Sequence, residues 1–314
     1  MDGLIHTLGK FDDPRITADG QDRAHVEYTG TKTLWFNTGT LCNIECANCY
    51  IESSPTNDRL VYLTKSDVLP YLDELELAGE QGIEIGITGG EPFMAPDILD
   101  ILEAILKHGH SLLILTNAMK PMMRERIQNG LLRLNTLFPD KMILRVSMDH
   151  FTAVTHDIER GTGSFQATLT GLIWLSDNNF QLAVAGRLNM QEDEATGRRG
   201  YDHLFSKHNI NIDVNDPVQL VLFPEMEVDK DPPEITTACW GILNKSPNSV
   251  MCSNQRMVVK FKGDKSPSVM ACTLLPYDVQ FNLGRTLAEG RKDVSLNHPF
   301  CATFCVLGGA SCSA

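Results

Sequence analysis

The sequence predicts an α/β fold in which a partial (β/α)6 barrel is followed by a small cysteine-rich domain. From Thr33 to about residue 225, short apolar runs alternate with helix-length amphipathic segments, the pattern of repeated βα units. After Pro224 prolines accumulate, helical patterns fade, and six of the nine cysteines lie between Cys239 and Cys312. We therefore divide the chain into an N-terminal extension (1–30), a barrel (31–225) and a cysteine-rich domain (226–314).

The elements of the predicted barrel follow from hydrophobic periodicity. Strands are predicted at 33–37, 83–88, 111–116, 142–148, 180–188 and 218–223. Helices are predicted at 65–82, 96–109, 122–138 and 164–179, whereas 191–217 carries no clear pattern. Thr64 and Asp67 predict a capping box for the first helix, and Gly82 and Gly109 predict the ends of the first two helices.

The two ends of the chain differ from the barrel in pattern. Residues 1–30 are polar and without periodicity, so we expect an extension that lies over the surface. Near the other end, the segments 256–262 and 268–274 flank the turn sequence GDKSP and predict a β-hairpin.

Composition and charge exclude several classes of partner. With 42% hydrophobic and 21% charged residues the chain has the composition of a globular protein, and no apolar run approaches the roughly 20 residues that cross a bilayer. The N-terminal residues lack the apolar core of a secretory signal, so we expect a cytoplasmic protein without a membrane partner. A net charge of -13 without a dense basic run argues against nucleic acid as a partner.

Nine cysteines in such a chain indicate metal or cluster binding. A disulfide framework is not expected in a reducing compartment, and an odd count leaves one thiol over. Cys42, Cys46 and Cys49 lie in one loop directly after the first strand, where three thiolates can surround one inorganic cluster. Three ligands leave the fourth iron of a four-iron cluster open. A structural zinc or unligated thiols are the alternatives, but residues 43–52 offer no histidine as fourth ligand.

Two further segments follow predicted strands. In Thr88–Pro92 (TGGEP) the paired glycines allow a ligand to approach the backbone, and Glu91 can accept from an ammonium group; a simple turn is the alternative. Ser147 and Asp149 place a hydroxyl and a carboxylate after the fourth strand, suited to a ribose, although Asp149 could instead cap the next helix. Because the carboxyl ends of parallel strands share one edge, these segments should converge on one site.

These motifs carry a resemblance to a known family. The segment CNIECANC resembles the CxxxCxxC loop of the radical S-adenosylmethionine (SAM) superfamily, and GGEP resembles its methionine-binding motif. The resemblance extends over residues 33 to about 225. It implies a [4Fe-4S] cluster on Cys42, Cys46 and Cys49 whose open iron takes the amino and carboxylate groups of SAM. It also implies reductive cleavage of SAM to a 5'-deoxyadenosyl radical, which abstracts hydrogen from a small-molecule or peptide substrate.

The resemblance also implies which residues contact SAM. Glu91 and the backbone of Gly89 and Gly90 would hold the amino group, and Ser147 would contact the ribose. The usual aromatic residue before the third cysteine is replaced here by Asn48. The full set of implied cofactor-binding residues is Tyr50, Gly89, Gly90, Glu91, Pro92, Asn117 and Ser147. Arg187, after the fifth strand, could reach SAM or substrate, although a surface salt bridge is the preferred interpretation.

The cysteine-rich domain loosely resembles the SPASM or twitch extension of radical SAM enzymes. That resemblance implies one auxiliary [4Fe-4S] cluster, with ligands drawn from Cys239, Cys252, Cys272, Cys301, Cys305 and Cys312. A zinc-stapled or purely apolar subdomain is the alternative. His298 could be a ligand, but a structural histidine is the preferred interpretation.

Several functions stay open on the sequence alone. The radical enzyme could act on a small molecule or as a peptide-modifying maturase, and would need a reducing partner such as flavodoxin or ferredoxin. A non-catalytic zinc or Fe-S protein and an electron carrier without SAM are the competing hypotheses. On position alone, the candidates for substrate contacts are Asp149, His150, Glu225 and Glu227.

Overall fold

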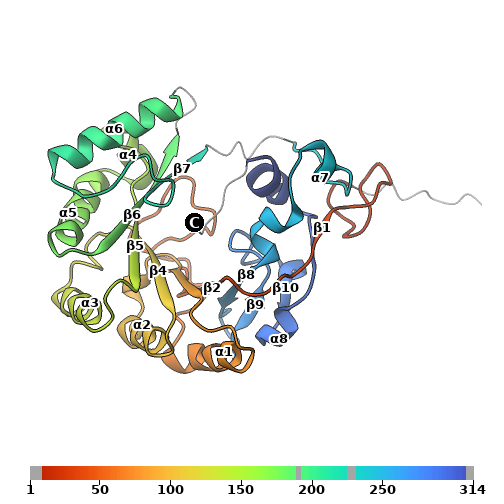
Figure 1. The fold of residues 1–314 in the computed structure, drawn as a ribbon, viewed down its shortest axis with the longest axis horizontal. Coiled ribbons are helices and arrows are strands. Elements are labelled where there is room, and N and C mark those ends of the chain that lie inside the picture. Colours follow the sequence, from red (N-terminus) through yellow and green to blue (C-terminus); the bar gives the residue numbers. More distant parts are fainter. Residues whose placement is uncertain (1–8, 189–191, 225–230, 309–314) are drawn as a thin grey trace, which may run out of the picture.

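The protein has the α/β architecture that the sequence predicts. A computed structural model describes residues 9–188, 192–224 and 231–308. The parallel strands of the barrel are β2 (Thr33–Asn37), β3 (Glu84–Thr88), β4 (Ser111–Thr116), β5 (Met142–Ser147), β6 (Gln181–Leu188) and β7 (Leu220–Pro224). Its helices are α1 (Lys65–Leu77), α2 (Ile98–Lys107), α3 (Glu125–Leu137), α4 (Ala153–Arg160), α5 (Ser164–Asp177) and α6 (Glu194–Lys207). The helices cover the outer face of the curved sheet (Figure 1). We call the cysteine-rich domain (226–314) the tail; its described part lies on the other side of the sheet. Among the described residues, no helix combines the length and apolar character needed to span a membrane.

The tail is made of short elements. They are α7 (Cys239–Ile242), β8 (Gln255–Val259), β9 (Ser268–Met270), β10 (Asn282–Gly284), α8 (Leu287–Gly290), β11 (Val294–Ser295) and a π-helical turn at Cys301–Leu307. The predicted hairpin is confirmed, because β8 and β9 pair antiparallel. Its first strand also pairs with β2 in parallel, so that the sheet order is β10-β9-β8-β2-β3-β4-β5-β6-β7. The barrel and the hairpin therefore share one sheet.

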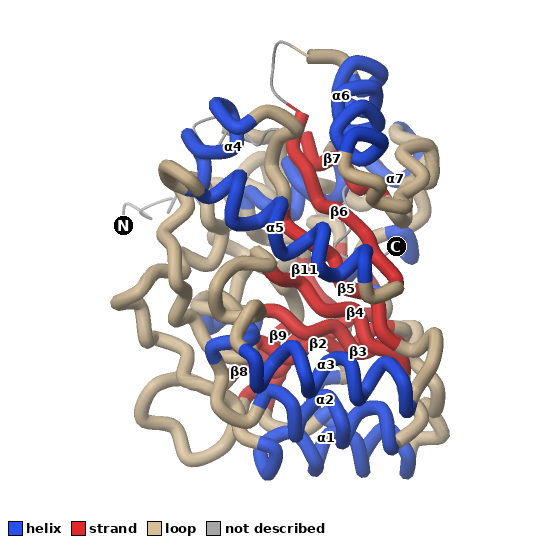
Figure 2. Tube along the Cα trace, turned by 90° about the vertical axis from the view of Figure 1, so that its left-hand side faces the viewer, coloured by secondary structure: helices blue, strands red, loops and turns tan. Residues whose placement is uncertain are grey.

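Alternation along the strands divides the apolar residues into two cores. Leu34 and Phe36 of β2 face the helices, whereas Trp35 between them faces inward and packs with residues of the tail. Figure 2 shows α1, α2, α3 and α5 packed along one face of the strands. Gly86 in β3 leaves room for the Trp35 indole, because a Cβ there would lie 2.2 Å from the ring. The inner face of the barrel is thus continuous with the core of the tail.

The helices differ from the prediction at three places. The capping box of Thr64 and Asp67 is present, but α1 ends at Leu77 and not at Gly82, with Gly79 at φ +72°. Helix α4 and helix α6 were not predicted. Helix α6 contains Gly197 and Gly200, which weaken its sequence pattern. Gly200 has a packing reason, since a Cβ there would lie 2.5 Å from the Phe151 ring.

The N-terminal segment is more than a surface extension. Strand β1 (His25–Val26) pairs with β11, and Ala24 and Val26 are fully buried in the core of the tail. The Arg23 guanidinium is also buried, and it pairs with Glu234. The expectation of a segment lying on the surface was therefore wrong for Arg23, Ala24 and Val26, because their apolar and charged partners come from the distant end of the chain.

Candidate active site

A cavity of about 230 Å³ lies at the carboxyl ends of the barrel strands. Among its lining residues are Cys42, Cys46, Cys49, Tyr50, Gly89, Gly90, Asn117, Ser147, Arg160 and Arg187. The structure therefore brings most of the predicted site residues together. A second cavity of about 160 Å³ adjoins it and shares Tyr50, Leu115, Ser147, Arg160, Arg187 and Leu274 with it. We call these the thiol cavity and the inner cavity.

The cysteine loop is fixed at both flanks and against helix α4. Leu41 bridges to Ser54, and the Cys42 N–H donates to the Ser54 carbonyl at 3.0 Å. Within the loop, the Ala47 N–H donates to the carbonyl of Glu159 at 2.9 Å. These bonds close residues 42–54 into a compact turn at the mouth of the barrel, so that the three thiols face one space.

The thiols of this loop are held in a poorly solvated environment. Burial raises the pKa of Cys42 to about 12 and also raises the pKa of Cys46. These two thiols therefore stay protonated until a metal centre binds and displaces the protons. The Cys49 sulfur accepts from the Ser53 N–H at 3.3 Å, and the Asn117 amide lies 3.9 Å from the Cys42 sulfur. Such donors stabilise thiolate ligands once they form.

The donor set fits a cluster better than a closed zinc site. Among the described residues that line the thiol cavity there is no histidine, aspartate or glutamate to complete a four-ligand shell. In the described chain, no group of three or more His, Cys, Asp or Glu side chains is placed to hold a single metal ion. Three thiols around one cavity without a fourth protein ligand are the donor set that a four-iron cluster with one open iron requires.

The two glycines of TGGEP allow close contact with the cysteine loop. A Cβ on Gly89 would lie 2.6 Å from the Gly39 carbonyl oxygen, and one on Gly90 would lie 2.3 Å from that of Leu41. Gly90 N–H donates to the Gly39 carbonyl at 2.8 Å. We predicted these glycines as a surface for ligand approach. In the structure they line the cavity on one side and on the other contact Gly39 and Leu41, directly before Cys42.

Glu91 lies behind the cavity wall and does not line it in the structure. Its side chain is buried, and its carboxylate accepts from the Thr116 hydroxyl at 2.9 Å, from the Asn117 N–H at 2.9 Å and from the Phe93 N–H at 3.2 Å. Burial raises the pKa of Glu91 to about 7, although these hydrogen bonds act to lower it. The carboxylate thus ties the end of β3 to the end of β4, and direct contact with a ligand ammonium stays a prediction.

The raised pKa of Glu91 predicts a pH dependence of stability. Because the folded pKa of about 7 exceeds the ordinary 4.5, the folded chain binds a proton between these values that the unfolded chain has lost. The contribution is fully present below pH 4.5 and is lost as the pH rises through 7, by at most about 3 kcal/mol. Urea unfolding of the metal-free chain at pH 5 and pH 8 measures it. In Glu91→Gln the difference between the two pH values should shrink by that amount, and an unchanged difference would contradict the assignment.

The other predicted cofactor residues occupy different positions around the thiol cavity. The Tyr50 ring lines it and packs edge-on against Phe300 and Phe304 of the tail. Ser147 lines both cavities. Asn117 donates to the Asn43 side chain at 2.9 Å and so joins the loop after β4 to the cysteine loop. Pro92 is buried at the start of a short 3-10 turn (Pro92–Met94) and does not line either cavity.

Sequence reasoning missed Arg160, the last residue of α4. Its guanidinium donates to Asp149 through Nε at 2.7 Å and Nη2 at 3.1 Å, and Arg187 Nε lies 3.4 Å from the same carboxylate. Burial raises the pKa of Asp149, but the charges of Arg160 and Arg187 outweigh it and hold the pKa below its usual value. The salt bridge expected for Arg187 is present, although in the cavity and not on the surface. Asp149 does not cap α4, so that alternative was wrong.

The remaining candidates for substrate contact fare differently. His150 is buried, accepts from the Thr152 N–H at 3.0 Å and pairs with Glu192 at 3.0 Å, so it stabilises the start of α4 and lines neither cavity. Glu225 and Glu227 lie outside the described residues. His298 accepts from the Phe300 N–H at 3.0 Å and packs edge-on against the Phe281 and Phe300 rings, as expected of a structural histidine.

A third cavity, in the tail, gathers four of the remaining cysteines. It is lined by Cys252, Cys272, Cys301, Cys305 and Arg256. Burial raises the pKa of Cys252 to about 11 and also raises the pKa of Cys301 well above its ordinary value. Cys239 lies elsewhere, beside Thr236, and Cys312 lies outside the described residues. Thr273 lines both this cavity and the thiol cavity, so a single segment separates them.

Comparison with known proteins agrees with this geometry. A sequence profile of the radical SAM superfamily matches residues 36–194, just over half of the chain. The chain therefore belongs to the radical SAM superfamily.

Individual relatives match parts of the chain. It is 32% identical over 146 residues to the antilisterial bacteriocin subtilosin biosynthesis protein AlbA of Bacillus subtilis, covering 46% of this chain and 30% of AlbA. It is 29% identical over 133 residues to the mycofactocin maturase MftC of Mycobacterium tuberculosis, covering 42% and 31%. The matches thus span about a third of these relatives. The structure of anSMEcpe with bound AdoMet superposes with a TM-score of 0.57 at 14% identity over 82% of this chain and 79% of that one, which shows a shared fold.

Proposed function

We propose that the chain is a radical SAM enzyme that binds a [4Fe-4S] cluster through Cys42, Cys46 and Cys49 and SAM in the thiol cavity. The observation that carries the proposal is the donor set, three thiols on one cavity without another metal-binding side chain among its described lining residues. The superfamily membership supplies the identity of the group that such a set holds. When bound, the cluster and SAM would supply a 5'-deoxyadenosyl radical.

The protein's own residues would then bind and orient SAM. The Gly89–Gly90 backbone is close to the cysteine loop and would face the amino group, with Glu91 behind it fixing the position of the two loops. Arg160 lies near the thiols, and its charge favours the thiolate form of Cys46. We assign its guanidinium to the SAM carboxylate, because of the two arginines that line the thiol cavity its charge acts more strongly on the Cys46 thiol.

Apolar walls would protect the reacting groups. Trp35, Leu115 and Leu274 line the thiol cavity, and Leu115 and Leu274 continue into the inner cavity. Such walls limit the access of water to a reactive intermediate. Tyr50 closes one side through its contacts with the tail and is the aromatic ring available to the adenine in place of Asn48. We accordingly place the target atom of the substrate in the inner cavity.

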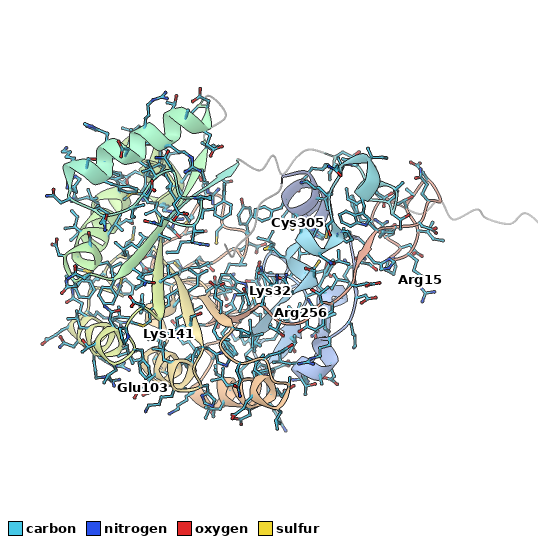
Figure 3. The ribbon with its side chains drawn as sticks, in the orientation of Figure 1. Arg15, Lys32, Glu103, Lys141, Arg256 and Cys305 are labelled. Carbon is cyan, nitrogen blue, oxygen red and sulfur yellow. The ribbon has the colours of Figure 1, made fainter. Side chains whose placement is uncertain are left out.

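The tail, residues 226–314, is proposed as an auxiliary-cluster domain of the SPASM or twitch kind. Its ligands would be Cys252, Cys272, Cys301 and Cys305, which line one cavity. Arg256 supports an anionic centre there. It is 2% exposed, and in the described structure its hydrogen bonds go to the carbonyls of Cys252, Gln255, Gly290 and Lys292, not to a carboxylate. A buried cation of this kind is costly unless negative charge lies nearby; the charge of Asp293 acts on Arg256, and four thiolates would add to it. Figure 3 labels Arg256 and Cys305 on the tail side of the molecule.

This ligand set predicts opposite results for cysteines inside and outside the tail cavity. The chain with both clusters should hold about eight irons, and Cys272→Ser/Cys305→Ser should hold about four because only two of the four cysteine ligands are left. Cys239→Ser is the control and should retain about eight, since Cys239 does not line the cavity. Iron and sulfide analysis after anaerobic reconstitution measures both. Loss of iron in Cys239→Ser, or full iron in Cys272→Ser/Cys305→Ser, would mean that the ligand set is different.

For substrate and partners, we propose a peptide substrate and a flavodoxin or ferredoxin as reductant, in the cytoplasm. The peptide assignment is supported by the names of two relatives, a bacteriocin biosynthesis protein and a maturase. A reductant is needed because SAM cleavage consumes an electron.

The test of the proposed function is anaerobic incubation of the reconstituted chain with SAM and dithionite, followed by chromatography for 5'-deoxyadenosine. We expect deoxyadenosine only when iron, reductant and SAM are all present. Zinc in place of iron, or iron without deoxyadenosine under any reductant, would contradict the proposal.

A further inference from the structure

We infer that the substrate presents a carboxylate to Arg145 and Arg187 in the inner cavity, beside an apolar group. The inference rests on the proposed function, because it assumes that the substrate occupies the cavity next to the SAM site. It names the substrate's chemistry, which neither the family nor the relatives define.

The charges on the wall of the inner cavity are unequal. Arg145, Arg160 and Arg187 line it, and Asp149 is the single acidic residue among its described lining residues. Asp149 already accepts two hydrogen bonds from Arg160 and lies 3.4 Å from Arg187. A cationic substrate group would therefore meet three cations and one occupied carboxylate, whereas an anionic group would meet complementary charge.

Arg187 bridges the two cavities. Besides its ion pair with Asp149, it donates from Nη2 to the Asn48 carbonyl at 3.1 Å, and its guanidinium lies 5.6 Å from the Tyr50 ring centroid. These contacts hold the guanidinium in place. Because the side chain is still 21% exposed, it stays accessible from the cavity. A guanidinium fixed in this way loses little side-chain entropy when it binds a carboxylate.

Arg145 lies deeper, on the inner face of β5. It is 2% exposed and sits beside Leu115 of β4 and Ala183 of β6 in the strand register. The charge of Arg145 acts on Glu84: burial raises the pKa of Glu84, while the hydrogen bond from Thr33 and the charge of Arg145 oppose that rise. Glu84 begins β3, at the opposite end of the barrel from the thiols, and does not line the cavity. Glu84 therefore adds no carboxylate to the described lining of the inner cavity.

Apart from Ser147, the rest of the described lining of the inner cavity is apolar. Phe223 and Phe304 lie with their ring centroids 6.2 Å apart at an interplanar angle of 26°, one from β7 and one from the tail. Leu115, Leu274 and the Tyr50 ring complete the wall. These side chains fit an aromatic or aliphatic group next to the carboxylate. An acidic residue beside an apolar residue in a peptide has this chemistry, and so does a free apolar acid.

The test compares carboxylate probes with matched analogues on the reconstituted holoenzyme in the presence of SAM. The free-acid pair is 3-phenylpropionate and 3-phenylpropylamine, and the peptide pair is N-acetyl-Phe-Asp-amide and N-acetyl-Phe-Asn-amide. Anaerobic equilibrium dialysis gives the dissociation constant of each. We expect the carboxylate of at least one pair to bind at least about tenfold more tightly than its partner, the effect of one charge-assisted contact. The pair that shows the preference distinguishes a free acid from a peptide.

Variants and a second readout make the outcome decisive. In Arg145→Gln and Arg187→Gln the ratio of the two dissociation constants within a pair should fall toward one. Arg145→Lys, which keeps the charge, should retain part of the preference for the carboxylate. In Arg145→Gln, whose position lines the inner cavity and not the thiol cavity, SAM affinity and deoxyadenosine formation measured on the same samples should stay near those of the parent chain. Equal binding within both pairs, or a preference that survives both glutamine variants, would overturn the inference, as would a loss of SAM affinity in Arg145→Gln. Absence of deoxyadenosine from the parent chain would instead contradict the proposed function.

Discussion

Replacing any one of Cys42, Cys46 and Cys49 by alanine is expected to abolish 5'-deoxyadenosine formation. The three thiols line the same cavity, and no other described lining residue is a histidine, aspartate or glutamate that could replace a lost thiolate. A cluster with only two protein ligands would not keep SAM in a defined position. The expected loss is at least about a thousandfold in the rate of SAM cleavage, because the chemistry depends on the cofactor and not on a side chain.

The tail supplies an internal control for this prediction. The proposed auxiliary cluster uses other cysteines, so each alanine variant should keep about four irons and a folded chain. Circular dichroism and iron analysis would verify that the loss is local. Deoxyadenosine at the parent rate in any of the three variants would remove these cysteines from the catalytic site.

Arg160→Met is expected to affect both SAM binding and stability. The substitution removes the proposed partner of the SAM carboxylate and leaves the buried Asp149 with Arg187 alone. We expect SAM to bind at least about 100-fold more weakly, and the free energy of unfolding to fall by about 3–5 kcal/mol, the usual result of removing one partner of a buried ion pair. Equilibrium dialysis with SAM and urea unfolding measure the two effects.

A double variant separates the two roles of Arg160. In Asp149→Asn/Arg160→Met no negative charge is left at position 149, so most of the lost stability should return. SAM binding should not return, because the cation that meets the carboxylate is still missing. Recovery of SAM affinity in the double variant would show that Arg160 acts only through Asp149.

The sequence predicted the barrel and the cysteine site because their signals are local. The alternation of apolar runs gave five strands nearly at their true ends, and β7 is displaced by only two residues from 218–223. The spacing of Cys42, Cys46 and Cys49 fits on one loop, and the strand before it places that loop at the mouth of the barrel. Such features need no knowledge of distant contacts.

What the sequence did not predict depends on residues far apart in the chain. Arg160 reaches Asp149 from a helix that was not predicted, and nothing in the residues around Gly161 indicates a charged group inside the barrel. The carboxylate of Glu91 is directed toward Thr116 and Asn117, 25 and 26 positions away. The burial of Ala24 and Val26 accompanies the pairing of β1 with β11, near the opposite end of the chain. Each of these requires the tertiary fold.

The most direct test of the central claim is whether SAM binds to the open iron of the cluster on Cys42, Cys46 and Cys49. The variant Cys272→Ser/Cys305→Ser should lack the auxiliary cluster, so a single reduced cluster contributes to its spectrum. Electron–nuclear double resonance with SAM labelled with 15N at the amino group then measures the contact. We predict a 15N hyperfine coupling that is absent with unlabelled SAM and in Arg160→Met at low SAM concentration. A reduced four-iron cluster without any nitrogen coupling at saturating SAM would contradict the account.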